Sequence, residues 1–268
     1  MEAPLSPARV LEWYVEAGVD ETIGEAALDR YALVSEPPPP ALVSEPTTAR
    51  APKPPLARQA APEKTLHDAY ALAESAGTVE ALRQALDSFN GCSLKKTAMN
   101  LVFGDGDVRA RILLIGEAPG AEEDRRGIPF VGPSGLLLNR MLASIGLDRS
   151  RVFISNTVFW RPPGNRTPTP QETALCLPFL ERLVEIIDPG IVVTLGGAAA
   201  KSLLAQSESV GRLRGRWFPY STPRLPRPVQ ATALYHPAYL LRTPAQKKAA
   251  WRDLLAIKGK LERLSTKS

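Results

Sequence analysis

The chain has 268 residues, of which 44% are hydrophobic and 23% are charged, so it can build one ordinary domain with an appendage or two small domains, and wholesale disorder is excluded. The formal net charge of +5 is unevenly spread, because residues 1–63 carry 5 Lys or Arg and 10 Asp or Glu, which leaves a basic main body that suits a polyanionic partner or a solvated face on an ordinary enzyme. Two cysteines exclude a disulfide framework and a four-cysteine metal site within one chain.

The first 63 residues differ in composition from the rest. Apolar residues at loosely helical spacing predict an N-terminal helical appendage in 1–35, either one helix broken at Gly18 or two short helices. Residues 36–63 hold nine of the 26 prolines and predict an extended linker. We therefore expect the main domain in 64–268. The chain lacks the long apolar run of a membrane span and the basic and apolar stretches of a signal peptide, so we expect a cytoplasmic protein that does not bind membranes.

Three helices can be predicted within the main domain. Apolar residues at 79, 82, 86 and 89 mark one face of a helix that ends at a turn signal, Asn90-Gly91. Thr169 followed by Pro170 and Glu172 is a capping box with proline at the first helical position, and Thr243-Pro244 resembles the start of the last helix.

Strands alternate with these helices from about residue 109. Short β-prone runs stand at 111–115, 152–156, 191–195 and 229–234, and the first and third are almost entirely apolar, as strands covered on both faces are. The alternation predicts an α/β fold with three layers, α/β/α, around a central four-stranded, mostly parallel sheet.

Polar residues follow three of these strands. Glu117 comes after the first, Asn156 ends the second and His236 follows the fourth, with Phe130 between two glycine-bearing turns. In parallel sheets, ligands bind beyond the carboxyl ends of the strands, so these side chains converge on a candidate site. Each residue also has a purely structural interpretation: a helix-capping glutamate, a turn asparagine, a hydrogen-bonded histidine and a core aromatic.

Five ordered motifs make the pattern specific. They are Gly-Glu-Ala-Pro-Gly with Glu-Glu-Asp from 116, Pro-Phe-Val-Gly from 129, Arg-Pro-Pro-Gly-Asn-Arg from 161 and His-Pro-Ala-Tyr-Leu-Leu-Arg from 236. In this order they resemble the family 4 branch of the uracil-DNA glycosylase superfamily, over about residues 86–260. The resemblance implies base flipping in uracil-containing DNA, hydrolysis of the N-glycosidic bond and a role in base excision repair.

Roles for individual residues also follow from the resemblance. It implies that Glu117 orients or activates water and balances charge on the sugar, and that His236 hydrogen-bonds uracil O2. Asn156 would read the uracil edge and Phe130 would stack on the base, with Gly116 and Ala118 completing the uracil pocket. The implied DNA contacts are Arg161, Arg166, Leu240, Leu241 and Arg242, to which we add Arg214 from an Arg-rich stretch whose other interpretation is a solvated loop.

One departure from the family concerns a cofactor. Many members hold an iron-sulfur cluster on four cysteines, whereas the matching positions here are Phe89, Cys92, Trp160 and Cys176. Four thiolates cannot be assembled from two, so we predict no cluster and no other cofactor or metal. Phe89 and Trp160 would fill the space, with the two cysteines as small buried side chains.

Alternatives remain open at this stage. The leading hypothesis is a monofunctional uracil-DNA glycosylase that acts as a monomer, with a possible protein partner for residues 1–63. A second is a non-catalytic glycosylase-like module that binds DNA beside a polymerase or repair complex. A third keeps the chemistry but changes the base, because Gly120 leaves room near the first motif.

Overall fold

The computed structural model describes residues 63–265. The chain divides into two units, Met1–Pro55 and Leu56–Ser268, and the described residues all lie in the second. The expected N-terminal helix and the proline-rich linker lie outside the described residues, apart from Glu63 at the end of the linker, which is the first residue of a helix. The domain boundaries stay a prediction. No helix in the described part has the length and apolar character needed to cross a membrane.

A six-stranded mixed sheet forms the centre of the described unit, in the order β1-β3-β2-β4-β6-β5. The four inner strands are parallel and match the four predicted runs: β3 (Phe153–Asn156), β2 (Ile112–Gly116), β4 (Ile191–Leu195) and β6 (Val229–Leu234). The predicted count of four is wrong by two, because β1 (Asp105–Gly106) and β5 (Trp217–Tyr220) pair antiparallel at the edges.

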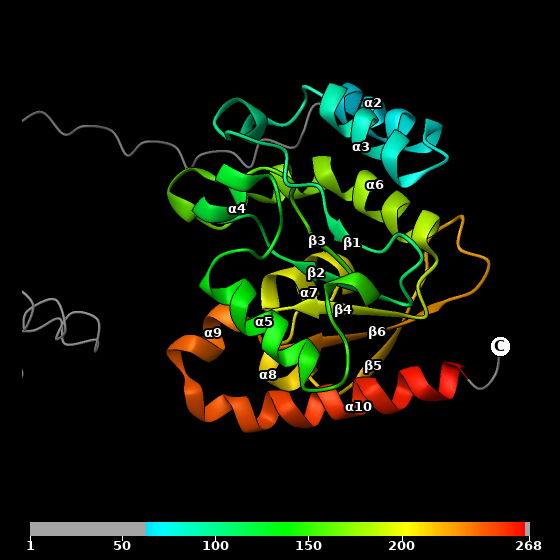
Figure 1. The fold of residues 1–268 in the computed structure, drawn as a ribbon. Helices are drawn as coiled ribbons and strands as arrows, with labels where there is room; N and C mark the ends of the chain where they lie inside the picture. Colours follow the sequence, from blue (N-terminus) through cyan, green and yellow to red (C-terminus); the bar gives the residue numbers. More distant parts are fainter. Residues whose placement is uncertain (1–62, 266–268) are drawn as a thin grey trace, which may run out of the picture. The chain divides into compact units, whose positions relative to one another are not determined.

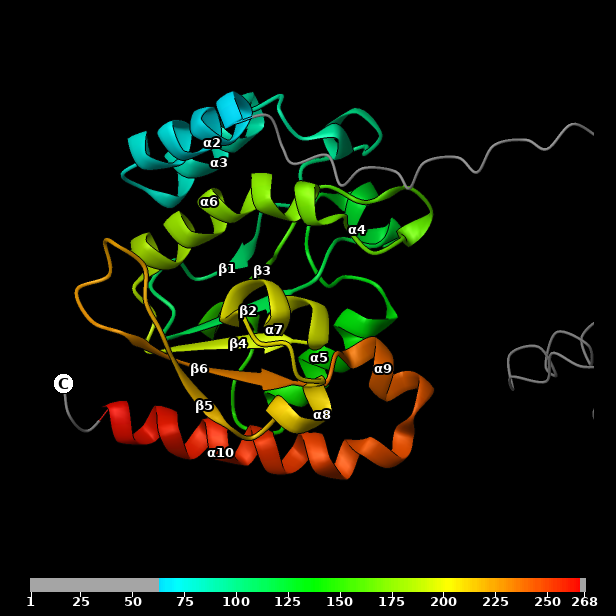
Figure 2. The ribbon, with the colours of Figure 1, turned by 180° about the vertical axis from the view of Figure 1, so that it is seen from behind.

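The parallel strands divide two hydrophobic cores between their faces. Successive side chains of a strand point to opposite faces, and Leu113 and Ile115 join one core while Ile112 and Leu114 join the other. Figures 1 and 2 show the resulting layers, with α6 on one face of the sheet and α5 and α10 on the other. The predicted three-layer α/β/α fold is therefore confirmed.

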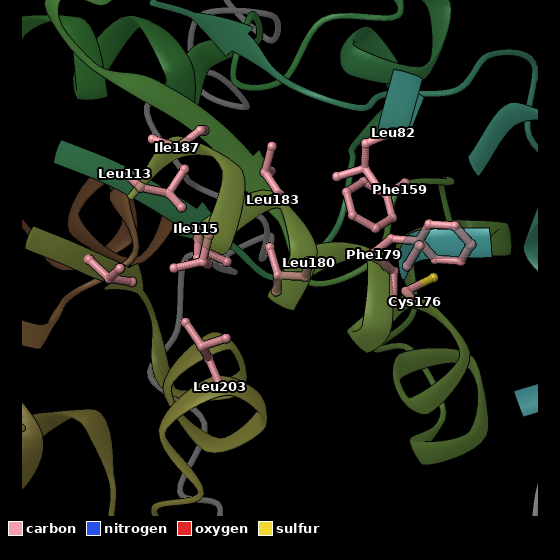
Figure 3. Close-up of a cluster of buried hydrophobic side chains, with 14 of the residues drawn as sticks. Leu82, Leu113, Ile115, Phe159, Cys176, Phe179, Leu180, Leu183, Ile187 and Leu203 are labelled. Carbon is pink, nitrogen blue, oxygen red and sulfur yellow. The ribbon is translucent and has the colours of Figure 1, made fainter. Parts of the chain in front are cut away.

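The first helical layer is made by α2 (Glu63–Ser75), α3 (Val79–Ser88) and α6 (Pro170–Ile187). The capping box predicted at Thr169 is present with both of its hydrogen bonds. Helix α3 follows the predicted face and buries Leu82 and Leu86. Figure 3 shows Leu82 near Phe159 and Phe179 in the core beneath these helices.

The second layer contains α5 (Pro133–Ala143) and α10 (Lys247–Ser265). The last helix begins later than Thr243-Pro244 predicts, because Pro244–Gln246 forms a 3-10 turn and Thr243 makes no side-chain cap. Short elements complete the fold: α4 (Ala121–Arg126), α7 (Gly197–Leu204), α8 (Val210–Leu213), α9 (Pro237–Arg242), and the 3-10 turns η2 (Ser93–Lys96), η3 (Arg149–Arg151), η4 (Pro163–Asn165) and η5 (Pro244–Gln246).

Candidate active site

A cavity of about 500 Å³ opens at the carboxyl ends of the parallel strands, and Glu117, Phe130, Asn156 and His236 all line it. This volume lies within the usual range for small-ligand sites, about 300–1,000 Å³. The sheet register explains the convergence, because Gly116 pairs with Asn156 across β2 and β3. The geometric expectation from the sequence, one hollow surrounded by acid, amide and imidazole, agrees with this arrangement.

Glu117 is held by its backbone and not by its carboxylate. Its carbonyl accepts hydrogen bonds from the Thr157 hydroxyl, at 2.6 Å, and from the Val158 amide, at 3.3 Å. Among the contacts found within residues 63–265, none engages the Glu117 carboxylate in a hydrogen bond or ion pair. The carboxylate is therefore available to a ligand or a water molecule in the cavity.

Asn156 is the last residue of β3 and is only 1% exposed. Its side-chain oxygen is buried and has no hydrogen-bond partner within the described protein. A β-carbon at Gly116 would lie 2.4 Å from this oxygen, so only glycine allows the two strands' ends to approach in this way. Since buried polar groups are normally paired, the orphaned oxygen points to a ligand donor.

Phe130 and His236 are neighbours in the cavity wall, and their rings contact each other at a tilt of 33°. Their ring centroids lie 5.6 Å apart. His236 precedes α9 as its N-cap, and Nδ1 accepts a hydrogen bond from the Ala238 amide at 3.1 Å. The helix start encoded by His-Pro therefore fixes the orientation of the imidazole.

The protonation state of His236 follows from its surroundings. The pKa of His236 is lowered from 6.5 to about 4, mainly by burial and also by the positive charge of Arg242, while the negative charge of Glu123 opposes the change. The imidazole is neutral at pH 7, and because Nδ1 accepts from Ala238, its proton resides on Nε2. His236 is thus a neutral hydrogen-bond donor at the cavity wall.

This protonation state is directly measurable. The chain has two histidines, so a His67→Gln variant leaves His236 as the only imidazole in an NMR titration. We expect its ring resonances to titrate with a midpoint of about 4. Because the unfolded chain binds more protons than the folded one between pH 6.5 and about 4, stability should fall as the pH is lowered through that window. A midpoint near 6.5 would contradict the assignment.

The structure places most of the remaining predicted site residues in or next to the cavity. Ala118, Arg166 and Arg242 line the cavity, while Gly116 lies beneath it at the end of β2. Arg166 donates to both oxygens of Glu172, at 2.7 and 2.8 Å, and this contact raises the pKa of Arg166. Its side chain is still 43% exposed, against 21% for Arg214, so we retain Arg166 as a proposed DNA contact. Arg161 stands beside the cavity and donates to Asn165, one of its lining residues, at 2.8 Å.

Two of the predicted DNA contacts, Leu240 and Arg214, require revision. Leu240 is 1% exposed and packs in the core, whereas Leu241 is 43% exposed. Adjacent residues on a helix face different directions, so we retain Leu241 and withdraw Leu240. We also withdraw Arg214, because its guanidinium is engaged by both oxygens of Asp253, at 2.8 Å each, and by the Ala249 carbonyl.

Several cavity residues are missed by sequence reasoning. Ser134 and Thr167 line the same hollow, as does Glu123 of the Glu-Glu-Asp motif, which the sequence had already singled out. Ser134 had a usable signal, since Pro133 marks the start of a helix whose first turn therefore stands at the rim. Thr167 had none, because it lies in the segment between η4 and α6, where no periodicity places a side chain.

The positions that match the cluster ligands of the family form a dry core. Phe89, Cys92, Trp160 and Cys176 are all buried and belong to one hydrophobic cluster, and Figure 3 shows Cys176 beside Phe179. The hydrogen bond between the two cysteines, together with burial, raises the pKa of Cys176, which favours a thiol there, and the same bond lowers the pKa of Cys92. Two cysteines between bulky aromatics do not fit a cluster that needs four ligands. Its absence stays a prediction.

Comparison with known proteins agrees with this fold and site. A family described as "Uracil DNA glycosylase superfamily" matches residues 103–255, more than half of the chain. The chain is 43% identical over 157 residues to a type-4 uracil-DNA glycosylase of Archaeoglobus fulgidus, covering 57% of this chain and 78% of that protein. It is 41% identical over 181 residues to the Saccharolobus solfataricus type-4 enzyme, covering 66% and 82%.

The geometry defines a class of three-layer α/β proteins in which a ligand cavity lies at the carboxyl ends of parallel strands. Within this class, the chain belongs to the uracil DNA glycosylase superfamily.

Proposed function

We propose that this protein is a monofunctional DNA glycosylase that hydrolyses the N-glycosidic bond of uracil in DNA, as the first step of base excision repair. The observation that carries the proposal is the shared cavity of Glu117, Phe130, Asn156 and His236. The similarity to relatives named type-4 uracil-DNA glycosylases supports the choice of uracil.

The electrostatics of the cavity suit this bond cleavage. The departing base becomes anionic while the sugar becomes cationic, so the reaction needs a donor at one end and a carboxylate at the other. Neutral His236 offers its Nε2 proton to uracil O2 without placing a formal positive charge in the site. Glu117, whose carboxylate is free of basic partners among residues 63–265, stabilises the sugar cation and orients the attacking water.

Asn156 and Phe130 are the residues that we propose recognise the base. A uracil edge presents O4 as an acceptor beside N3–H as a donor, and only a side chain with both functions matches it. Asn156 supplies them, with its unpaired oxygen accepting from N3–H and its amide nitrogen donating to O4. Phe130 stacks on the flipped ring. Gly116 and Ala118 leave space for the base. Glu117, Phe130, Asn156 and His236 are therefore the proposed uracil-binding and catalytic residues.

A rim of exposed residues provides the proposed DNA contacts. Leu241, exposed on α9, would enter the duplex and fill the space that the base vacates, and Arg242 on the same helix would meet a phosphate. Arg166 in the cavity lining and Arg161 beside it would also contact the backbone. Phosphate contacts of this kind fix register and make binding sensitive to salt.

The test is excision from defined oligonucleotides. The purified protein is incubated with single-stranded, U:G and U:A substrates and then with alkali, with a thymine-containing strand of the same sequence as the control. We expect strand cleavage at the uracil position only. Intact uracil strands on all three substrates would reject the proposed activity, and binding without cleavage would favour the alternative of a non-catalytic DNA-binding module.

Further parts of the proposal concern the whole protein. We propose that it acts as a monomer in the cytoplasm, needs no cofactor, and uses residues 1–63 for any protein partner. The acidic balance of that segment, with 5 basic and 10 acidic residues, supports a docking role because it opposes DNA binding by the segment itself.

A further inference from the structure

The backbone of Phe130 adopts a conformation that an aromatic residue seldom tolerates. Its φ is +54°, in the left-handed region where glycine and asparagine are the usual occupants. The ring nevertheless lies in a defined place, only 5% exposed and against the cavity. A residue stays in such a conformation only when its surroundings hold it there.

Arg149 holds this backbone from outside the cavity. Its Nη1 donates to the Phe130 carbonyl at 3.0 Å, and its Nη2 donates to the Pro129 carbonyl at 2.8 Å. Its Nε donates to Asp105 Oδ2 at 2.7 Å. Three sides of one planar guanidinium are thus engaged, and a lysine cannot reproduce this because its ammonium is a single compact charge.

The short elements η3 and β1 position Arg149 and Asp105 for this contact. Arg149 begins η3, which Asp148 caps by accepting from the Ser150 amide at 2.8 Å. Asp105 lies in β1, which consists of only Asp105 and Gly106. A β-carbon at Gly106 would lie 2.0 Å from the Val152 carbonyl oxygen and 3.0 Å from that of Arg149. Glycine at this position therefore brings the edge strand close enough for Asp105 to reach Arg149.

The opposite side of the same segment is also fixed. Glu123 Oε1 accepts from the amides of Val131, at 3.0 Å, and Gly132, at 2.9 Å. A β-carbon at Gly135, in the first turn of α5, would lie 1.8 Å from the Phe130 carbonyl oxygen. Residues 129–132 are therefore clamped between carbonyl contacts on one side and amide contacts on the other, and Arg149 is the part of the clamp outside the cavity lining.

We propose that Arg149, oriented by Asp105, is a positioning residue for uracil excision: by hydrogen-bonding the Pro129 and Phe130 carbonyls it maintains the left-handed backbone that aims the Phe130 ring at the flipped base. This inference rests on the proposed function. Arg149 touches neither base nor sugar, and it acts through Phe130.

The test separates positioning from general stability. We expect Arg149→Lys to lower the single-turnover excision rate at saturating enzyme by about tenfold to a hundredfold, since misplacing a reacting group by about 1 Å has effects of this size. Affinity for undamaged duplex of the same sequence should not change. Arg151→Lys is the matched control, because Arg151 lies in the same turn and, among the residues that the structure describes, donates only to the Gly146 carbonyl, at 3.0 Å. This variant should excise at the wild-type rate.

A second variant and a second measurement protect the test against misfolding. Asp105→Asn retains the size of its side chain but weakens the orientation of Arg149, so its excision rate should fall between those of wild type and Arg149→Lys. Amide hydrogen exchange should accelerate in residues 128–134 of Arg149→Lys and stay unchanged in β2 and β4. A wild-type excision rate in Arg149→Lys, or exchange that accelerates equally throughout the protein, would overturn the proposal.

The exchange measurement does not depend on catalysis. If the wild-type protein fails to excise uracil but Arg149→Lys still loosens residues 128–134 alone, the proposed function fails while the clamp on Phe130 stands. If excision is observed and Arg149→Lys leaves both excision and exchange unchanged, the clamp fails and the proposed function stands.

Discussion

Replacing Glu117 by glutamine should slow single-turnover excision of uracil by about 10²- to 10³-fold, equivalent to about 3–4 kcal/mol of barrier, by analogy with the loss of one preorganised group facing developing charge. Glutamine keeps the shape and removes the negative charge that faces the sugar cation. Because the carboxylate makes no hydrogen bond or ion pair that we find within residues 63–265, the thermal unfolding midpoint should stay at the wild-type value. The measurement combines rapid-quench excision assays with thermal unfolding.

Glu122→Gln is the matched control for this experiment. Glu122 lies in the first turn of α4, close in sequence to Glu117, but it is outside the cavity lining and forms ion pairs with Arg125 and Arg126. Surface pairs of this kind contribute little to stability, so this variant should excise and unfold as wild type does. Excision by Glu117→Gln at the wild-type rate would remove Glu117 from the proposed mechanism, whereas equal loss of DNA binding and excision would assign it to binding alone.

The fold was predictable wherever hydrophobic pattern and turn chemistry agreed. The run 191–195 is almost entirely apolar because helices cover both faces of β4, and its position matches the structure. The capping box at Thr169 placed the start of α6 for a local reason, two reciprocal hydrogen bonds within three residues. Such signals need no knowledge of the rest of the chain.

The edge strands were unpredictable for the opposite reason. β1 is two residues long and contains Gly106 at φ +120°, so neither length nor propensity indicates a strand. β5 contains Pro219, which argues against a central strand and is compatible with an edge. Both strands form because a sheet already exists beside them.

The candidate site likewise has residues that the sequence order predicts and residues whose placement depends on long-range contacts. Glu117, Asn156 and His236 were placed together because parallel strands end at one edge, a rule that needs only their order in the sequence. The choice between Leu240 and Leu241 depends on the rotation of α9, and the loss of Arg214 as a DNA contact depends on Asp253, 39 residues away. Long-range pairs of this kind leave no trace in a single sequence.

The protonation of His236 likewise depends on its burial. A histidine before a proline has no characteristic pKa, and desolvation is the largest cause of the change to about 4. In the proposed mechanism, a donor that stays neutral at pH 7 would stabilise the anionic base without repelling Arg242 or attracting Glu117 out of position.

Most substitutions of a buried residue lower stability, whereas Asn156→Leu should keep or raise stability and lower the rate of uracil excision. The buried, unpaired Asn156 oxygen costs the folded state about 1–3 kcal/mol, and leucine of similar size removes this cost. We expect the free energy of unfolding to stay constant or to rise by about 1 kcal/mol. Excision should fall at least about 30-fold, because two uracil groups would be buried without partners. Denaturant unfolding and single-turnover excision measure the two effects.

Binding to product-like DNA provides the control for Asn156→Leu. A duplex with an abasic-site analogue offers no base to the cavity, so the variant should bind it with the affinity of the wild-type protein, while its affinity for uracil-containing DNA decreases. Wild-type excision by Asn156→Leu would show that uracil is read elsewhere. Loss of affinity for the abasic duplex would instead mean that Asn156, at the junction of β3 and the cavity, supports the DNA-binding surface and does not read the base.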